Sequence, residues 1–169
     1  MFGRWLARRT APTLPGPEQL NAVVRRELPG ADDGSVVVVT AIAGLLGTIA
    51  YADRDYSERE EARVRHELER VHGMTEGGIK AICAALREHV VHVSTVESPR
   101  YARALLELAD RELRVEVLEA LVELAAADGA ITITESNLLR QLTAALGLSQ
   151  TDYNAAQSKH RDRIAALKT

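Results

Sequence analysis

The sequence predicts an all-α protein that folds as one compact domain. Ala, Leu, Glu and Arg are abundant, whereas aromatic residues make up only 4% of the chain, and unbranched side chains lose little conformational freedom in a helix. Apolar residues recur at the three- and four-residue spacing of amphipathic helices. A chain of 169 residues with 46% hydrophobic composition has the size of a single domain with one sizeable core.

The segment 1–16 is expected to form a basic arm and linker outside the folded body. It contains three Arg and no acidic residue, and the stretch from Thr10 to Pro17 holds three prolines and a glycine, which do not propagate a helix. No continuous apolar run of the kind found in a secretory signal is present. A frayed terminus is the preferred interpretation; contact of Phe2, Trp5 and the Arg residues with a membrane surface or a partner is the alternative.

The folded domain is expected from residue 17 to residue 169, in two halves of about 35–93 and 98–168. Ser35 is the expected N-cap of the most apolar helix, and residues 93–98 are expected to form a polar, β-branched connection between the halves. A break near Asp110 and a continuous helix through it both fit the pattern. The expected helices span about 19–28, 35–52, 57–71, 76–93, 101–110, 111–127, 132–147 and 149–167.

The stretch 35–52 carries no charged side chain, and its length is at the lower edge of what spans a bilayer. Threonines and glycines interrupt the run, and acidic residues flank both ends without the Lys/Arg asymmetry that orients a membrane span. The corresponding helix later in the chain carries three glutamates. We therefore expect the buried central helix of a soluble domain rather than a membrane span.

Two acidic turns, each after an apolar helix and before a capping box, organise the sequence. A single constant offset aligns three pairs: Asp53 with Asp128, Ser57 with Thr132, and Glu60 with Glu135. In each copy the Ser or Thr and the Glu three positions later can close each other's free backbone amides. An offset shorter by one position aligns the segments 73–75 and 147–149. This ordered series predicts two related helical halves with an internal pseudo-two-fold repeat.

The second turn carries a family resemblance. Residues 124–132 read Leu-Ala-Ala-Ala-Asp-Gly-Ala-Ile-Thr, followed by Glu135, and residues 146–149 read Leu-Gly-Leu-Ser. With the weaker first copy, they resemble the TerB-like family, tellurite-resistance-associated helical domains that also occur at the start of a membrane-anchored J-domain co-chaperone. The resemblance implies a bundle of about seven to eight helices and a non-enzymatic binding or scaffold role in tellurite, stress or metal resistance. The first copy departs from the family's Asp-Gly at Asp53-Arg54.

The resemblance also implies that the acidic positions hold a divalent cation. Carboxylate oxygens are the ligands that Ca²⁺, Mg²⁺ and Mn²⁺ take, without a need for Cys or His. The alternative is purely structural, with the glutamates as helix caps and the aspartates in helix-ending turns. An EF-hand is excluded, because a loop that begins at Asp53 has Glu58 where Gly is required. The candidate metal ligands are Asp53, Asp55, Glu60, Asp128 and Glu135.

An enzyme is not expected, because the sequence lacks a nucleophile elbow, a Gly-rich phosphate loop, an HExxH motif and paired cysteines. Cys83 falls on an apolar helix face and is interpreted as a small core residue. His89 and His92 lie three positions apart, but no third ligand is evident, so a polar helix face is the preferred interpretation. The remaining histidines stand alone in the same way: His66, His72 and His160.

The charge distribution limits the expected partners. Residues 1–16 and 158–169 each contribute +3 to a net charge of −3, which leaves −9 on residues 17–157. This acidic body disfavours nucleic acid. Protein partners are expected, with peripheral contact to a membrane protein or surface and homo-oligomer formation as further options. The single Cys fits a reducing, cytoplasmic location. A purely structural or oligomerising helical domain without a metal site is the alternative function.

Overall fold

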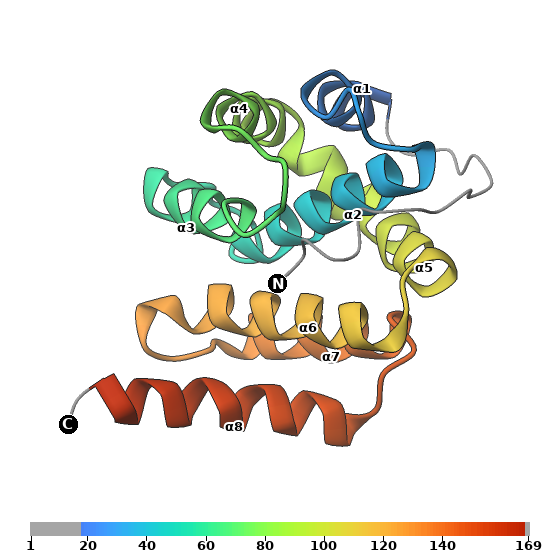
Figure 1. Cartoon of the computed structure of the whole chain (residues 1–169). Helices are drawn as coiled ribbons and strands as arrows, with labels where there is room; N and C mark the ends of the chain where they lie inside the picture. Colours follow the sequence, from blue (N-terminus) through green and yellow to red (C-terminus); the bar gives the residue numbers. More distant parts are fainter. Residues whose placement is uncertain (1–17, 168–169) are drawn as a thin grey trace.

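The computed structural model describes residues 18–167, and all regular structure within this range is helical. Figure 1 shows α1 to α4 in the upper part of the bundle and α6 to α8 in the lower part. The all-α prediction is confirmed. The elements are α1 (Glu18–Glu27), α2 (Asp33–Ala50), α3 (Glu58–Leu68), α4 (Glu76–His92), the π-helix η2 (Val93–Glu97), α5 (Ser98–Leu108), α6 (Arg111–Ala125), the 3₁₀ turn η3 (Ala126–Asp128), α7 (Ile133–Ala145) and α8 (Gln150–Leu167).

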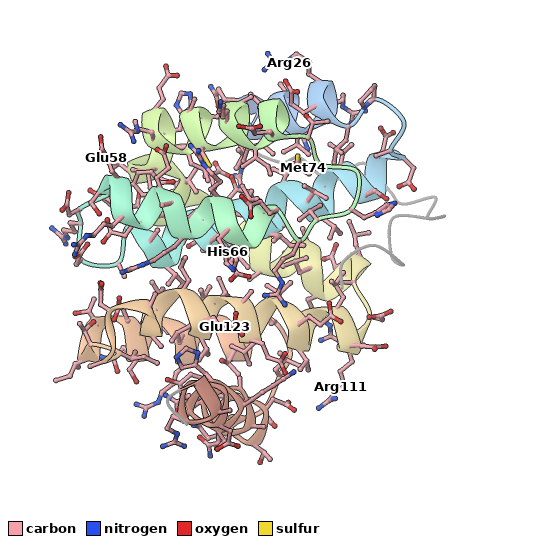
Figure 2. All side chains as sticks on the ribbon, turned by 60° about the vertical axis from the view of Figure 1, so that its left-hand side comes forward. Arg26, Glu58, His66, Met74, Arg111 and Glu123 are labelled. Carbon is pink, nitrogen blue, oxygen red and sulfur yellow. The ribbon has the colours of Figure 1, made fainter. Side chains whose placement is uncertain are left out.

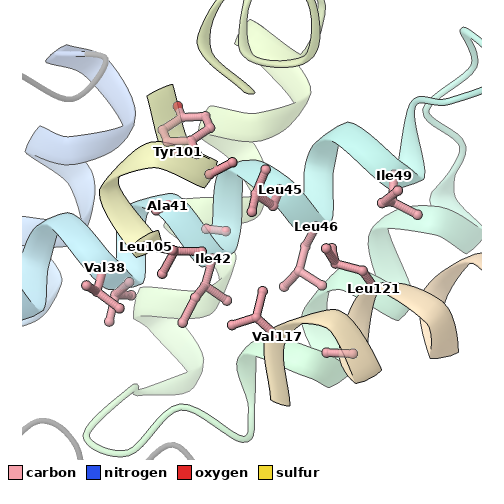
Figure 3. Close-up of a cluster of buried hydrophobic side chains, with 14 of the residues drawn as sticks. Val38, Ala41, Ile42, Leu45, Leu46, Ile49, Tyr101, Leu105, Val117 and Leu121 are labelled. Atoms are coloured by element: carbon pink, nitrogen blue, oxygen red, sulfur yellow. The ribbon is translucent and has the colours of Figure 1, made fainter. Parts of the chain in front are cut away.

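Helix α2 is the centre of the fold. Every residue from Gly34 to Ala50 is buried, and the helix packs against α1, α3, α4, α5 and α6. A helix that is apolar on all sides needs neighbours on all sides to remove its surface from water. By length and composition α2 could also cross a membrane, but 94% of it is buried inside the bundle. Figure 3 shows its apolar side chains interleaved with those of α5 and α6.

Glycines in α2 allow two neighbouring helices to approach closely. A Cβ atom on Gly44 would lie 2.2 Å from the ring of Tyr101, and one on Gly47 would lie 2.9 Å from Cδ2 of Leu86. Real Cβ atoms do not make such contacts. The tyrosine of α5 and the leucine of α4 therefore occupy the space that a larger residue in α2 would take.

The start of α2 differs from the prediction. The cap is Asp32 rather than Ser35: the Asp32 carboxylate accepts a hydrogen bond from the Ser35 backbone amide at 2.8 Å and a second from the Ser35 hydroxyl at 3.1 Å. Both residue types cap helices well. Because the aspartate takes this role, the helix begins two residues earlier than expected, and Ser35 becomes a buried residue of its first turn.

The connection expected over residues 93–98 is instead helical. The π-helix η2 joins α4 to α5 without an extended segment. Pro99 has no amide hydrogen to donate to the helix ladder, and side-chain hydroxyls use carbonyl groups in this region: Thr95 Oγ1 donates to the Val91 carbonyl at 2.6 Å and Ser98 Oγ to the Ser94 carbonyl at 3.1 Å. Burial of η2 against α2 outweighs the low helix propensity of β-branched residues.

The break near Asp110 is present, because the Asp110 carboxylate caps α6 by accepting a hydrogen bond from the Leu113 amide at 2.9 Å. The order of helices in the two halves, α2–α4 and α6–α8, is the order that the sequence offsets predict. The pseudo-two-fold relation between the halves stays a prediction. The basic segment expected over residues 1–16 lies outside the described residues.

Helix α3 lies against α6 and connects the two halves by charge. Figure 2 shows these helices side by side, with Glu123 labelled on α6. Arg70 Nη1 is 2.8 Å from Glu67 Oε2 and 3.4 Å from Glu123 Oε2. Glu67 is only 5% exposed, and a buried carboxylate is stable only with such a partner. Arg70 therefore neutralises a buried group in the first half while it contacts the second.

Candidate functional site

The first acidic turn follows α2 and has a strained backbone. Arg54 adopts a φ of 67° and is the one non-glycine residue with positive φ in the described range. For a residue with a Cβ this conformation costs about 1–2 kcal/mol. Its amide donates to the Tyr51 carbonyl at 2.8 Å, and Asp53 Oδ1 accepts a hydrogen bond from the Asp55 amide at 3.0 Å. The Asp53 side chain thus stabilises the turn itself.

The second acidic turn shares two features with the first, a residue with positive φ and a hydrogen bond from its amide to the carbonyl three residues back. Gly129 adopts a φ of 101°, and its amide donates to the Ala126 carbonyl at 2.9 Å. The offset that pairs Asp53 with Asp128 also pairs Arg54 with this glycine. Glycine adopts positive φ without a steric penalty because it has no Cβ. The Asp-Gly of the second half is therefore the relaxed version of a turn that Asp53-Arg54 makes under strain.

The Asp128 carboxylate is held by Arg63 of α3. Nη1 of Arg63 is 3.1 Å from Oδ2 of Asp128, and Nη2 donates to Oδ1, so the guanidinium binds both carboxylate oxygens. This hydrogen bonding lowers the pKa of Asp128 and raises that of Arg63. Asp53 of the first turn has no equivalent arginine at the corresponding position, because the offset pairs Arg63 with Leu138.

Both predicted capping boxes are present. The Ser57 amide donates to Glu60 Oε2, and the Glu60 amide donates to Ser57 Oγ at 3.3 Å. In the second copy the Thr132 amide donates to Glu135 Oε2 at 2.8 Å, and the Glu135 amide donates to Thr132 Oγ1 at 3.2 Å. Each glutamate therefore uses a carboxylate oxygen to begin a helix.

Four of the five candidate metal ligands use their carboxylates in contacts within the protein, and Asp55 contributes its backbone amide to one of these contacts. Asp53 bonds to the amide of Asp55, Asp128 to Arg63, and the two glutamates to their helix caps. Within residues 18–167 no three His, Cys, Asp or Glu side chains lie close enough together to hold a metal ion. Among the described residues the two turns therefore do not join in one ligand cluster, and a cation site at either turn stays a prediction.

A pocket of about 330 Å³ lies beside the second turn, where the end of α6 faces α8. Val122, Ala126 and Ile131 form its apolar wall, and Gly129 of the turn also borders it. The opposite side is polar and comes from one turn of α8: Gln157, His160 and Arg161. An apolar wall with a few convergent polar groups is the usual composition of a ligand pocket.

The polar side of this pocket is only partly engaged within the protein. His160 Nε2 is buried and has no hydrogen-bond partner, Arg161 Nη2 donates to the neutral hydroxyl of Ser158 at 3.3 Å, and Gln157 Nε2 donates to the Tyr153 hydroxyl at 3.0 Å. Sequence reasoning treated His160 as unaccompanied. The signal that could have found the site is the i, i+3, i+4 spacing of the three α8 residues, which places them on one helix face.

The corresponding position in the first half is filled by side chains. The sequence offsets pair Ile131 with Tyr56 and His160 with Leu86. Leu86 is fully buried and contacts α2 so closely that the residue there is Gly47. Tyr56 is packed against the same core, and burial raises the pKa of its hydroxyl above the ordinary value. The residues that the offsets pair with two pocket residues therefore pack in or against the core of the first half.

Cys83 also belongs to this closed region, as a core thiol. It is 1% exposed, and burial raises its pKa to about 11, so the thiol is protonated at neutral pH. This agrees with the interpretation as a small core residue. The two histidines of α4 lie near different carboxylates: His92 Nε2 is 3.1 Å from Glu97 Oε1, and His89 is 3.8 Å from Glu88.

Comparison with known proteins identifies a family. The family model described as "Tellurite resistance protein TerB" matches residues 39–158, from within α2 to within α8, and so includes both acidic turns and most of the pocket lining. Searches of curated proteins and of solved structures found no match.

Proposed function

Because this chain belongs to the TerB family, whose model covers residues 39–158, we propose that it is a non-enzymatic binding or scaffold module in tellurite resistance or a wider stress and metal-ion response. The family match is the observation that carries this proposal. The proposed module acts in the cytoplasm through contacts with protein partners and through peripheral contact with a membrane protein or a membrane surface. The bundle supports a scaffold role because Arg63 and Arg70 of the first half tie the two halves together, which keeps its surfaces in a fixed relation.

Deletion of the gene in its own host tests the proposal. The deletion strain is expected to be more sensitive than its parent to tellurite, or to another metal or oxidative stress, and a plasmid with the wild-type gene restores growth. A plasmid with Gly44→Leu is the control, since the Tyr101 ring leaves no space for a side chain at this position. Equal growth of parent and deletion strain under tellurite, copper, zinc and peroxide would show that the proposed role is wrong.

A purely structural or oligomerising domain is the second candidate function. Asp128 and both capping glutamates already have structural partners, which favours it over a cation site. Thermal melts with Ca²⁺, Mg²⁺ and Mn²⁺ separate the two. If the turns bind a cation, the melting temperature rises with cation concentration, and Asp128→Asn removes the rise. If the turns are structural, the melting temperature is independent of the cation.

A further inference from the structure

We propose that the pocket between the end of α6 and α8 is a binding site for a small organic carboxylate, with the acid group on α8 and the carbon chain against α6. This goes beyond the proposed function, because it assigns a soluble ligand to a module proposed to act through protein contacts. The site lies beside the second acidic turn, next to Gly129. The pocket combines an apolar wall from the end of α6 and the second turn with a polar side from α8.

The size of the pocket limits the ligand. Its volume of about 330 Å³ is at the lower end of the range for small-molecule sites. The wall of Val122, Ala126 and Ile131 offers only apolar side chains, which gain from contact with a hydrocarbon chain and gain nothing from a highly charged one. A short aliphatic or aromatic acid fits these two conditions better than a nucleotide or a metal complex.

The charge of the lining determines the sign of the ligand. No Asp or Glu is among the residues that line the pocket. Arg161 has a neutral hydroxyl as its partner and no ion pair among the described residues, whereas Lys159 on the same helix is paired with Glu119 at 2.8 Å. A guanidinium binds a carboxylate through two parallel hydrogen bonds. Gln157 and His160 line the pocket from the same helix face.

The first half shows that the open pocket is not a necessary result of this helix arrangement. At the corresponding place Leu86 and Tyr56 fill the space between α2 and α4. At the positions that the sequence offsets pair with these, the second half has a histidine in place of the leucine and an isoleucine in place of the tyrosine. A buried imidazole nitrogen without a partner costs free energy relative to a leucine. The Tyr56 hydroxyl of the first half is also buried without a hydrogen-bond partner.

Titration of ¹⁵N-labelled full-length protein with butyrate, hexanoate and benzoate tests the proposal, with butyramide and hexanamide as neutral isosteres and inorganic phosphate as an anion without a carbon chain. Saturable shifts are expected for the carboxylates at the amides of Gly129, Gln157, His160 and Arg161. The amides and phosphate are expected to cause no saturable shift. Equal shifts from acids and amides, or no shifts from any acid, would overturn the proposal.

Two variants and one control assign the effect to the pocket. Arg161→Gln is expected to weaken carboxylate binding about tenfold or more, the loss of one charge-assisted interaction. His160→Leu installs the residue of the closed half and is expected to abolish binding while the protein melts at the same or a higher temperature. Arg87→Gln, at the corresponding position on α4 where Arg87 is paired with Glu61, leaves binding unchanged. Retention of binding in both pocket variants would contradict the proposed site.

Titration with peptides distinguishes a free organic acid from the carboxyl terminus of a protein as the ligand. Hexapeptides that end in Leu with a free or an amidated carboxyl group are titrated in the same way. Binding of the free acids supports the proposal whether or not the free-terminus peptide also binds. Binding of the peptide alone overturns it and indicates a protein partner instead. The growth phenotype of the deletion strain tests the proposed function separately, so either result can fail without the other.

Discussion

The two acidic turns share a residue with positive φ and one backbone hydrogen bond but differ in the residues that surround them. The first is made by Asp53-Arg54, carries a positive φ at an arginine, and lies beside a region closed by Leu86. The second is made by Asp128-Gly129, is relaxed, is gripped by Arg63, and lies beside an open pocket. At both turns the chain leaves an apolar helix and begins a capped one. The side chains next to each turn determine whether the space there is core or binding site.

Exchange of residues between the two places gives the sharpest test of this difference. Leu86→His puts the residue of the open half into the closed one, where the side chain is fully buried. It should lower the free energy of unfolding by about 3–5 kcal/mol, because apolar contacts are lost and an imidazole is buried without a partner. Urea unfolding followed by circular dichroism measures the change. A loss below about 1 kcal/mol would mean that the first half is not a closed core.

Exchange at the turn residue has a smaller effect, with opposite signs in the two copies. Gly129→Arg imposes a Cβ on a φ of 101° and should destabilise the protein by about 1–2 kcal/mol. Arg54→Gly removes the same strain and should stabilise it by about 0.5–1 kcal/mol, since glycine also loses more backbone entropy on folding. Unfolding in urea of both variants is the measurement. The same sign for both would show that the turns are not equivalent.

The Arg63–Asp128 pair should make the stability of the protein depend on pH. The pKa of Asp128 is lowered in the folded protein, so the pair stabilises the fold at pH values above the unfolded pKa of about 3.9, and this stabilisation is lost as the pH falls through the folded pKa. Arg63→Leu, which copies Leu138, removes the contribution. Wild type and variant should therefore differ in stability at pH 7 and become alike near pH 2.

High salt and a second substitution control that comparison. The pair is exposed on the aspartate side, so the difference at pH 7 should decrease in 1 M NaCl. Asp128→Asn in the Arg63→Leu background should add no further pH dependence, because the partner is already absent. A difference that persists unchanged at pH 2 would mean that Arg63 stabilises the fold by packing rather than by charge.

The smallest effect on stability, but a clear difference in reactivity, is expected for thiols at two corresponding positions. The sequence offset pairs buried Cys83 with Gln157 of the pocket. Burial raises the pKa of Cys83 to about 11, so Ellman's reagent should modify it only slowly at pH 8 without denaturant. Gln157→Cys in a Cys83→Ala background should react much faster. Equal rates would indicate that the pocket is closed in solution.

Local sequence signals predicted the helices well and the site poorly. Ser57 and Thr132 are predicted as caps because a glutamate stands three positions after each, and the structure confirms both. The cap at Asp32 was missed because an aspartate and a serine competed for one role. The loop predicted over 93–98 was wrong because local β-branched composition gave no measure of the burial against α2.

The missed contacts join residues that are distant in the chain. Arg63 and Asp128 are 65 positions apart, and no periodic pattern relates them. The pocket is formed by a turn after α6 and a face of α8. Of these two parts, the sequence shows only the spacing of the polar residues on α8. The second acidic turn was identified from sequence as the more characteristic of the two. The sequence pointed to its carboxylate, whereas the structure places the open pocket beside its glycine.

The helical continuity from α4 through η2 to α5 determines how this protein can be divided. A protease or an engineered break needs a surface segment that tolerates local unfolding, and residues 93–98 provide a packed helix instead. The non-helical segments 51–57 and 69–75 lie within the first half. Split fragments intended to reassemble should therefore be separated at one of these segments. A cut between the halves would break the continuous helical connection that joins them.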